Sequence, residues 1–281
     1  MRLTIGDSHL HTKESDGAYS VAEVINFAIE KKLSYICFTD HYPLPPKLAK
    51  KEISGFSDAY IKEIVNAKKK FENVIDICLG AEFDWLQDYA EWTANEISNQ
   101  RYDYILGSIH YIFDMKGKCS LVDKNEETFL EIMKDWGGIK NVVSEYYRQL
   151  RLMIQSELFD GVGHFDLIKI YNKSESLFSE ESSWYKEEVI KTLDVLAQSK
   201  MCLEINTNGW YKKCSAQYPS FWILKEAKQR HIPITLSSDG HRDDGIGRDL
   251  LRVLELAQSA GYDSIVRFKQ RQMITIELAK V

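Results

Sequence analysis

The stretch VAEVINFAIEKKLSYICFTDH, residues 21–41, contains the structural unit that repeats along this chain. Its first part places apolar residues at helical spacing, and Ser20 with Glu23 forms a capping-box pattern that predicts the start of a helix. The apolar run at residues 35–38 is typical of a buried strand, and it ends at the polar pair Asp40-His41. A helix that leads directly into such a strand predicts one unit of a parallel sheet.

Strand-like runs of this kind occur seven times, at residues 3–5, 35–38, 75–79, 104–106, 159–162, 201–205 and 232–236. Between them, helical periodicity is found at residues 21–32, 57–71, 141–157, 183–198 and 220–230. Because there is no glycine-rich dinucleotide fingerprint, the alternation favours a closed or distorted (β/α)7 TIM-like barrel over an open doubly wound sheet. We expect residues 1–281 to form a single domain, with excursions at residues 41–55 and 111–125.

The composition predicts a cytoplasmic protein. A net charge of −6 disfavours a sequence-independent grip on nucleic acid phosphates. No stretch is apolar enough to span a membrane, and the first residues lack the pattern of a secretory signal. The five cysteines include no CxxC pair, so we interpret Cys37, Cys78 and Cys202 as small buried residues in a reducing compartment.

Six of the seven histidines lie at or just past the carboxyl end of a predicted strand. This is the face on which barrel enzymes assemble their sites. His9 and His11 come first, and because alternate strand residues point the same way, both rings can face one point. A single such histidine is as readily a hydrogen-bonded core residue, but six in register predict a site for divalent cations.

Carboxylates at the same strand ends extend this set to nine candidate ligands. A carboxylate can bridge two cations, whereas a neutral imidazole normally ligates one, so Glu82 is the candidate bridge. Asp16 has an alternative interpretation, because the run Ser15-Asp16-Gly17 is equally typical of a simple turn. The nine candidates are His9, His11, Asp16, His41, Glu82, His110, His164, Asp239 and His241.

Other polar residues flank this set. We expect Asp40, Asp84 and Asp166 to orient imidazole N–H groups or to close local turns. The seventh histidine, His231, lies before a strand and is interpreted as a residue at the C-terminus of a helix.

Taken together, the motifs resemble the polymerase and histidinol phosphatase (PHP) superfamily, and in particular its histidinol phosphate phosphatase branch. The resemblance covers nearly the whole chain. It is carried by HLH at 9–11 with DG at 16–17, TDH at 39–41, GAE at 80–82, SIH at 108–110, GHFD at 163–166, EINTNG at 204–209 and SDGH at 238–241. It implies a distorted (β/α)7 barrel that holds two or three divalent metal ions, drawn from zinc, manganese and iron.

The resemblance also implies how the ligands are shared. One ion would be held by His9, His11, Glu82 and Asp239, a second by Glu82, His110 and His164, and a third by Asp16, His41 and His241. The implied reaction is the hydrolysis of L-histidinol phosphate in histidine biosynthesis, by a hydroxide that Glu82 helps to position between metals.

A phosphate dianion also requires side-chain cations, and we expect Lys169, Lys212 and Arg242 to supply them because they closely follow predicted strand ends. Here the chain departs from the branch it resembles. Tyr211 stands where arginine is typical, and Lys169 stands where arginine is often seen. Lysine is a point charge without the bidentate fork of arginine, and a role on the solvated surface is the alternative for these lysines.

Two other functions remain open at this point. The same chemistry could act on another small phosphomonoester or on a nucleotide, or the barrel could be a noncatalytic metal-binding scaffold. In the catalytic alternatives the partner is a small phosphate ester, and neither nucleic acid nor a membrane is expected. None of the nine ligand positions is blank, which disfavours the scaffold.

Overall fold

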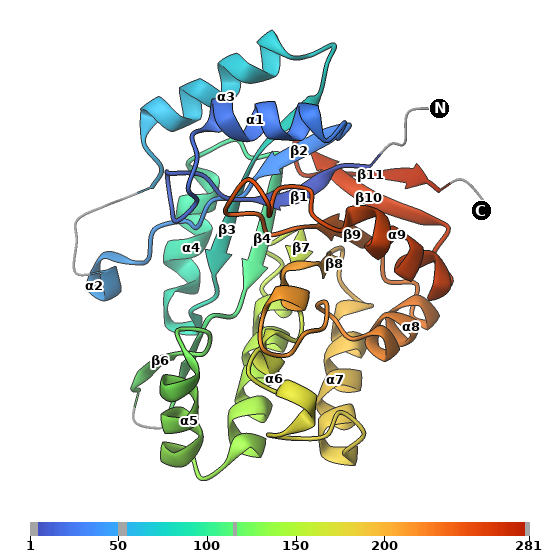
Figure 1. The fold of residues 1–281 in the computed structure, drawn as a ribbon. Coiled ribbons are helices and arrows are strands. Elements are labelled where there is room, and N and C mark those ends of the chain that lie inside the picture. Colours follow the sequence, from blue (N-terminus) through green and yellow to red (C-terminus); the bar gives the residue numbers. More distant parts are fainter. Residues whose placement is uncertain (1–4, 50–54, 115–116, 279–281) are drawn as a thin grey trace.

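The computed structural model describes residues 5–49, 55–114 and 117–278. Seven parallel strands follow one another around a barrel in chain order, with helices outside them (Figure 1). The strands are β1 (Asp7–Leu10), β2 (Tyr35–Phe38), β3 (Asp76–Asp84), β4 (Tyr104–Ser108), β7 (Gly161–Val162), β8 (Cys202–Asn206) and β9 (Ile234–Ser237). The predicted (β/α)7 barrel is therefore confirmed.

The barrel closes between its first and last strands. A parallel bridge joins Leu10 to Gly240, just past the end of β9. The amide of His11 donates to the carbonyl oxygen of Gly240 at 3.1 Å. Closure at this seam brings the histidines of β1 beside the acidic residue that follows β9.

Nine α-helices lie within the described residues. They are α1 (Val21–Glu30), α2 (Pro46–Ala49), α3 (Asp58–Lys70), α4 (Ala90–Ser98), α5 (Glu126–Asp135), α6 (Ile139–Gln155), α7 (Ser183–Leu196), α8 (Phe221–Gln229) and α9 (Leu250–Ser259). The capping box predicted for α1 is present: the Ser20 hydroxyl accepts from the amide of Glu23, and the Glu23 carboxylate accepts from the amide of Ser20 at 2.8 Å. None of the helices in the described part of the chain is long and apolar enough to cross a membrane.

The prediction for the first strand is wrong in position. Leu3 and Thr4 lie outside the described residues, and Ile5 is not part of a strand, whereas β1 begins at Asp7. The sequence did not predict β1 because this strand is polar rather than apolar. The Asp7 carboxylate is satisfied only in the folded barrel, where it accepts hydrogen bonds from the amides of Ser238 and Gly247 at 2.9 Å each.

The two predicted excursions contain some regular structure. The first includes α2, and residues 50–54 of it lie outside the described part. The second forms an antiparallel hairpin of β5 (Tyr111–Phe113) and β6 (Cys119–Leu121), with residues 115–116 undescribed. Helices α4, α5 and α9, both hairpins and the short helical turns were not predicted.

One end of the barrel interior is filled by a small apolar cluster. Cys37, Cys78 and Cys202 are buried there with Tyr104, as predicted for the three cysteines. A C-terminal hairpin, β10 (Ser264–Lys269) and β11 (Gln272–Glu277), covers this end, and the ring of Phe268 stacks on that of Tyr104 at 4.9 Å. Because side chains alternate along a strand, the inward positions four residues beyond Cys78 and two beyond Cys202 are Glu82 and Glu204.

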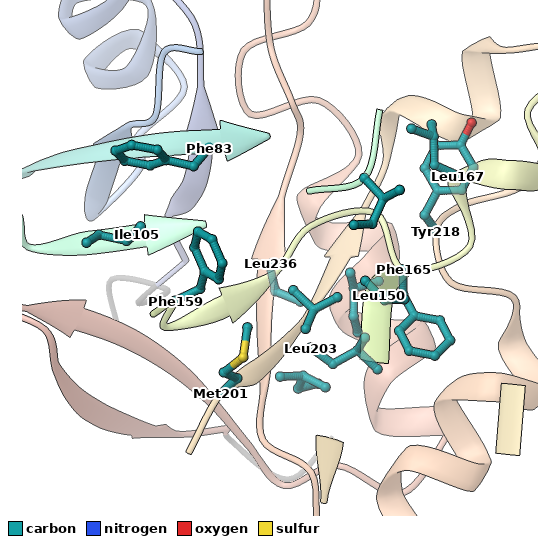
Figure 2. Close-up of a cluster of buried hydrophobic side chains, with 14 of the residues drawn as sticks. Phe83, Ile105, Leu150, Phe159, Phe165, Leu167, Met201, Leu203, Tyr218 and Leu236 are labelled. Carbon is teal, nitrogen blue, oxygen red and sulfur yellow. The ribbon is translucent and has the colours of Figure 1, made fainter. Parts of the chain in front are cut away.

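The main hydrophobic core contains the other face of the strands and the helices that cover it. Figure 2 shows part of it, with Leu203 of β8 and Leu236 of β9 near Leu150 of α6, and Ile105 of β4 farther along the same cluster. All four side chains are fully buried. This packed layer holds the strand ends rigidly, and those ends carry the polar site.

Candidate metal centre

The structure brings all nine predicted ligands together at the carboxyl ends of the strands. His9 lies within β1 and Glu82 within β3, and both are buried. The others lie on the short segments that follow β1, β2, β4, β7 and β9: His11, Asp16, His41, His110, His164, Asp239 and His241.

Glu82 lies at the centre of the group, and its two oxygens contact different histidines. Oε2 is 3.2 Å from Nε2 of His9 and 3.0 Å from Nδ1 of His41. Oε1 is 3.0 Å from Nε2 of His164 and 3.9 Å from Nε2 of His110. A carboxylate with separate partners on its two oxygens has the arrangement expected of a bridging ligand, and the bridging role itself stays a prediction.

Asp239 and His11 join the two sides of the barrel seam. Oδ1 of Asp239 is 3.3 Å from Nε2 of His11 and 3.7 Å from Nε2 of His9. The two Nε2 atoms of His9 and His11 are only 2.9 Å apart. Two imidazole nitrogens and a carboxylate oxygen therefore converge on one point.

Asp16, which could equally have been a simple turn residue, lies at the outer end of the group. Its Oδ2 is 3.2 Å from Nε2 of His241 and 3.8 Å from Nε2 of His41, and its Oδ1 is 3.6 Å from Nδ1 of His11. Its side chain is 55% exposed, so this part of the site opens to solvent.

The donor atoms fit divalent cations. Three groups have ligand atoms within 4.8 Å of one another: His11, Asp16, His41 and His241; His9, His11 and Glu82; and His41, Glu82 and His110. These groups overlap the predicted sharing of ligands but differ from it, because His11 and His41 each belong to two groups and His164 and Asp239 belong to none of them. Imidazole nitrogen combined with carboxylate oxygen suits zinc, manganese or iron.

The charges of the group are strongly coupled. Burial disfavours an ionised Glu82, but His9 and His41 outweigh it and hold the pKa of this carboxyl well below its ordinary value. Burial, and then the charge of His241, lower the pKa of His11 to about 4, so its ring is neutral at pH 7 and able to ligate. In His9 burial acts in the same direction, but Glu204 and Glu82 outweigh it and raise the pKa.

Two of the three flanking aspartates have the predicted kind of role. Oδ1 of Asp84 is 2.7 Å from Nδ1 of His110 and so orients that ring. Asp40 closes the turn that carries Asp16, because it accepts from the amide of Thr12 and from the hydroxyl of Ser15, both at 2.6 Å.

The third aspartate and the first predicted phosphate ligand pair with each other instead. The ammonium of Lys169 is buried, and its Nζ is 2.7 Å from Oδ2 of Asp166. It also donates to the hydroxyl of Ser220 and to the carbonyl oxygen of Gln217. All three of its N–H groups thus have partners, so Lys169 could contact phosphate only by giving one up, and Asp166 orients no imidazole.

The other predicted phosphate contacts lie at the surface. Lys212 and Arg242 are exposed, and within the described part of the chain no ion pair is recorded for either. Arg242 directly follows His241, so its position suits an anion at this face. The centroid of the Tyr211 ring, at the position where arginine is typical of the branch, lies 3.4 Å from the guanidinium carbon of Arg248.

The prediction missed several residues that hold the ligands. Glu204 is fully buried, and its Oε1 is 2.6 Å from Nδ1 of His9. Ser108 donates to Oε1 of Glu82 at 2.5 Å, and Asn208 donates to Oδ2 of Asp239 at 3.1 Å. The alternation along β8 could have placed Glu204 inside the barrel, since it lies two residues after the buried Cys202.

Comparison with known proteins agrees with this geometry. A family model described as "PHP domain" matches residues 7–208. The chain belongs to the PHP domain family. The match extends from β1 to Asn208 and so includes seven of the nine candidate ligands, all but Asp239 and His241.

Relatives narrow the position of the chain within the PHP family. A "Probable histidinol-phosphatase" of Deinococcus radiodurans is 30% identical over 277 residues, which are 95% of this chain and 97% of that protein. The "Histidinol-phosphatase" of Bacillus subtilis is 29% identical and covers 86% of this chain and 95% of its own length. These relatives place the chain in the histidinol-phosphatase branch.

A solved structure supports the fold. The histidinol phosphate phosphatase HisK of Lactococcus lactis, complexed with zinc, L-histidinol and phosphate, superposes with a TM-score of 0.77. The two sequences are 21% identical, and the match covers 96% of this chain and 99% of that one. At this identity the similarity concerns the shared barrel.

Proposed function

We propose that this protein hydrolyses L-histidinol phosphate to L-histidinol and inorganic phosphate, as a metal-dependent phosphomonoesterase of the cytoplasm. The single observation that carries the metal dependence is the position of Glu82, whose two oxygens lie among five imidazole rings at one barrel mouth. The substrate is supported by the names of full-length relatives and by the ligands of the Lactococcus lactis structure.

The centre would hold two or three divalent ions, with zinc, manganese and iron as the candidates. We assign it the nine predicted ligands, with Glu82 shared between ions. When bound, such cations supply activation of water for attack and neutralisation of the charge of a phosphate ester. With cations bound, the buried histidines would supply neutral nitrogen donors, and Asp84 keeps the ring of His110 in one orientation.

The protein contributes to the reaction mainly by holding the metal ligands in place and by positioning the phosphate group. The ligands are fixed by strand ends packed on the core, so the site is ordered before substrate enters. Asp16 and His241 are partly exposed and lie at the entrance, where a phosphate group would arrive. Arg242 and Lys212 are the proposed cationic contacts for that group, in place of the occupied ammonium of Lys169.

The direct test compares substrates on the metal-loaded protein. We expect kcat/KM for L-histidinol phosphate to exceed that for p-nitrophenyl phosphate by on the order of 100-fold or more, because specific contacts add to the shared phosphate chemistry. A 3′,5′-bisphosphate serves as the nucleotide alternative. A value for histidinol phosphate no higher than that for the aryl ester would overturn the substrate assignment.

Metal removal separates the enzyme from a scaffold. We expect dialysis against EDTA to abolish turnover and addition of zinc or manganese to restore it, because water activation depends on the cation. Elemental analysis should find at least one metal per chain. Less than one metal, with no activity restored by either ion, would favour the noncatalytic alternative.

A further inference from the structure

Glu204 lies fully buried on β8 and contacts two of the candidate ligands at once. Its Oε1 is 2.6 Å from Nδ1 of His9 and accepts from the hydroxyl of Ser237 at 2.7 Å. Its Oε2 accepts from the backbone amide of His164 at 2.6 Å and from the side-chain amide of Asn206 at 3.2 Å. This one carboxylate therefore connects β1, β8, β9 and the segment after β7.

The contact to His9 determines which ring nitrogen can ligate. An ionised carboxylate can only accept, so when the His9 ring is neutral, as a metal ligand must be, its one hydrogen lies on Nδ1. The Nε2 atom then carries the lone pair, and this atom faces Glu82 at 3.2 Å and His11 at 2.9 Å. Outer carboxylates of this kind orient metal-binding histidines and raise the basicity of the ring.

The contact to His164 acts on the backbone. Nδ1 of His164 is buried without a hydrogen-bond partner among the residues that the structure describes, so none of their side chains orients this ring in the way that Asp84 orients His110. The residue also has a φ of 20°, which few side-chain-bearing residues adopt. The bond from its amide to Glu204 holds this conformation, and the ring then points Nε2 at Oε1 of Glu82, 3.0 Å away.

We propose that Glu204 is a positioning residue that sets the cation affinity of two ion positions together, through His9 on one oxygen of Glu82 and His164 on the other. This inference rests on one part of the proposed function, namely that the nine candidate ligands bind cations. Glu204 begins the EINTNG motif at 204–209, and the ligand sharing implied by the family resemblance does not include it.

A glutamine at this position provides a sharp test because it keeps the shape and loses one acceptor. If the amide oxygen stays on the His164 amide, the NH2 group faces His9 and forces the hydrogen of that ring onto Nε2, which can then no longer ligate. If the amide is reversed, the buried N–H of His164 faces another donor. Either orientation disables one of the two histidines.

Asp84 supplies the matched control. Among the described residues its carboxylate has one recorded hydrogen bond, to Nδ1 of His110. An asparagine can turn its oxygen toward that ring, so Asp84→Asn changes the same kind of group beside the same kind of ligand without a conflict between donors. The difference in zinc affinity between Glu204→Gln and Asp84→Asn therefore reports that Glu204 positions both His9 and His164.

The experiment measures zinc binding to the full-length apo-proteins by competition with a chromophoric chelator, with far-UV circular dichroism as the check on folding. We expect Glu204→Gln to weaken zinc binding by about 10- to 100-fold and to lower the number of tightly bound ions, and Asp84→Asn, which contacts one candidate ligand and keeps an acceptor for it, to weaken zinc binding less than Glu204→Gln does. Equal affinities for Glu204→Gln and the unsubstituted protein would overturn the proposal.

A measurement on the unsubstituted protein covers the case in which the variant fails to fold. Long-range 1H–15N spectra of the zinc-loaded protein report the tautomer of each imidazole, and the resonance lost in His9→Gln identifies that ring. We expect the hydrogen on Nδ1 of His9, and a hydrogen on Nε2 would contradict the proposal. Because substrate enters neither experiment, a failure to hydrolyse histidinol phosphate would leave this result standing.

Discussion

At the scale of single residues, the site contains buried charged groups that stabilise one another, and any one of them would be destabilised by burial without its partners. Glu82 is 1% exposed, and a lone carboxylate so buried would take up a proton. Its pKa instead lies well below the ordinary range, because His9 and His41 outweigh the effect of burial. The candidate ligands could be predicted from the sequence because they lie at or just past the ends of strand-like runs. The effects of their charges on one another's pKa values depend on distances across the barrel, which the sequence does not give.

The same reasoning makes a prediction for a cysteine near the site. Burial, and then the charge of Asp84, raise the pKa of the Cys119 thiol to about 11 from its ordinary value of 9.0. The thiolate is the reactive form, so at pH 8 a shift of this size lowers the reactive fraction by about 100-fold. We expect iodoacetamide to modify Cys119 about 100-fold more slowly than a free thiol, measured by peptide mass spectrometry.

Replacement of Asp84 provides the control for that prediction. Asp84→Asn removes the second cause of the shift and leaves burial in place, so alkylation of Cys119 at pH 8 should become faster but stay slower than that of a free thiol. A Cys119 that reacts at the rate of a free thiol in the unsubstituted protein would show that the folded environment does not raise its pKa.

At the scale of elements, strand alternation explains why ligands and core residues share the same strands. On β3, Cys78 and Glu82 point inward, one into the apolar cluster and the other into the site. Five of the strand predictions were accurate to within a few residues because their runs are apolar. β1 was misplaced because its polar residues are satisfied by partners elsewhere in the barrel, such as Ser238.

The helix cap of α1 can be tested at this scale. Ser20 and Glu23 form a reciprocal cap that was predicted from the sequence and is present in the structure. We expect Ser20→Ala to lower the free energy of unfolding by about 1 kcal/mol, because the first turn loses an acceptor for its amides. Urea unfolding measures the difference, and Ser20→Asp, which restores an acceptor, should recover most of it. No loss in the alanine variant would mean that solvent replaces the cap.

At the scale of the whole molecule, the C-terminal hairpin closes the end of the barrel opposite the site. Arg271, in the turn between β10 and β11, donates through Nε to both oxygens of Asp160 at 3.0 and 3.1 Å and through Nη2 to the carbonyl oxygen of Leu158 at 2.8 Å. Asp160 is only 8% exposed. The hairpin was missed in the sequence because its strands have no helical partner and contribute nothing to the βα repeat.

This anchor leads to a prediction about stability. Arg271→Ala leaves the buried Asp160 without its cation, and we expect a loss of about 2 kcal/mol, less than for a fully buried pair because Arg271 is itself 34% exposed. The matched control is Arg267→Ala on β10, whose partner Asp76 is 37% exposed, and its expected cost is under about 1 kcal/mol. Thermal unfolding of the two apo-proteins compares them, and equal losses would argue against the anchoring role.

The sequence by itself determined the barrel and the identity of the nine candidate ligands. Both follow from local patterns: apolar runs of strand length, helical periodicity between them, and histidines or carboxylates where the runs end. Alternation along each strand is a local property, so it needs no knowledge of neighbouring strands.

Only the tertiary structure decided how those residues interact. Residues 9 and 204, or 9 and 239, meet because the barrel closes, and no spacing along the chain encodes a distance across it. The folded structure showed that the ammonium of Lys169 is paired with Asp166 and held by partners 48 and 51 residues farther along the chain, that His11 and His41 each lie between two groups of ligands, and that Glu204 holds two of the histidines. The physical reason is that hydrogen bonds and charge interactions depend on separations of a few ångströms, which long-range packing alone sets.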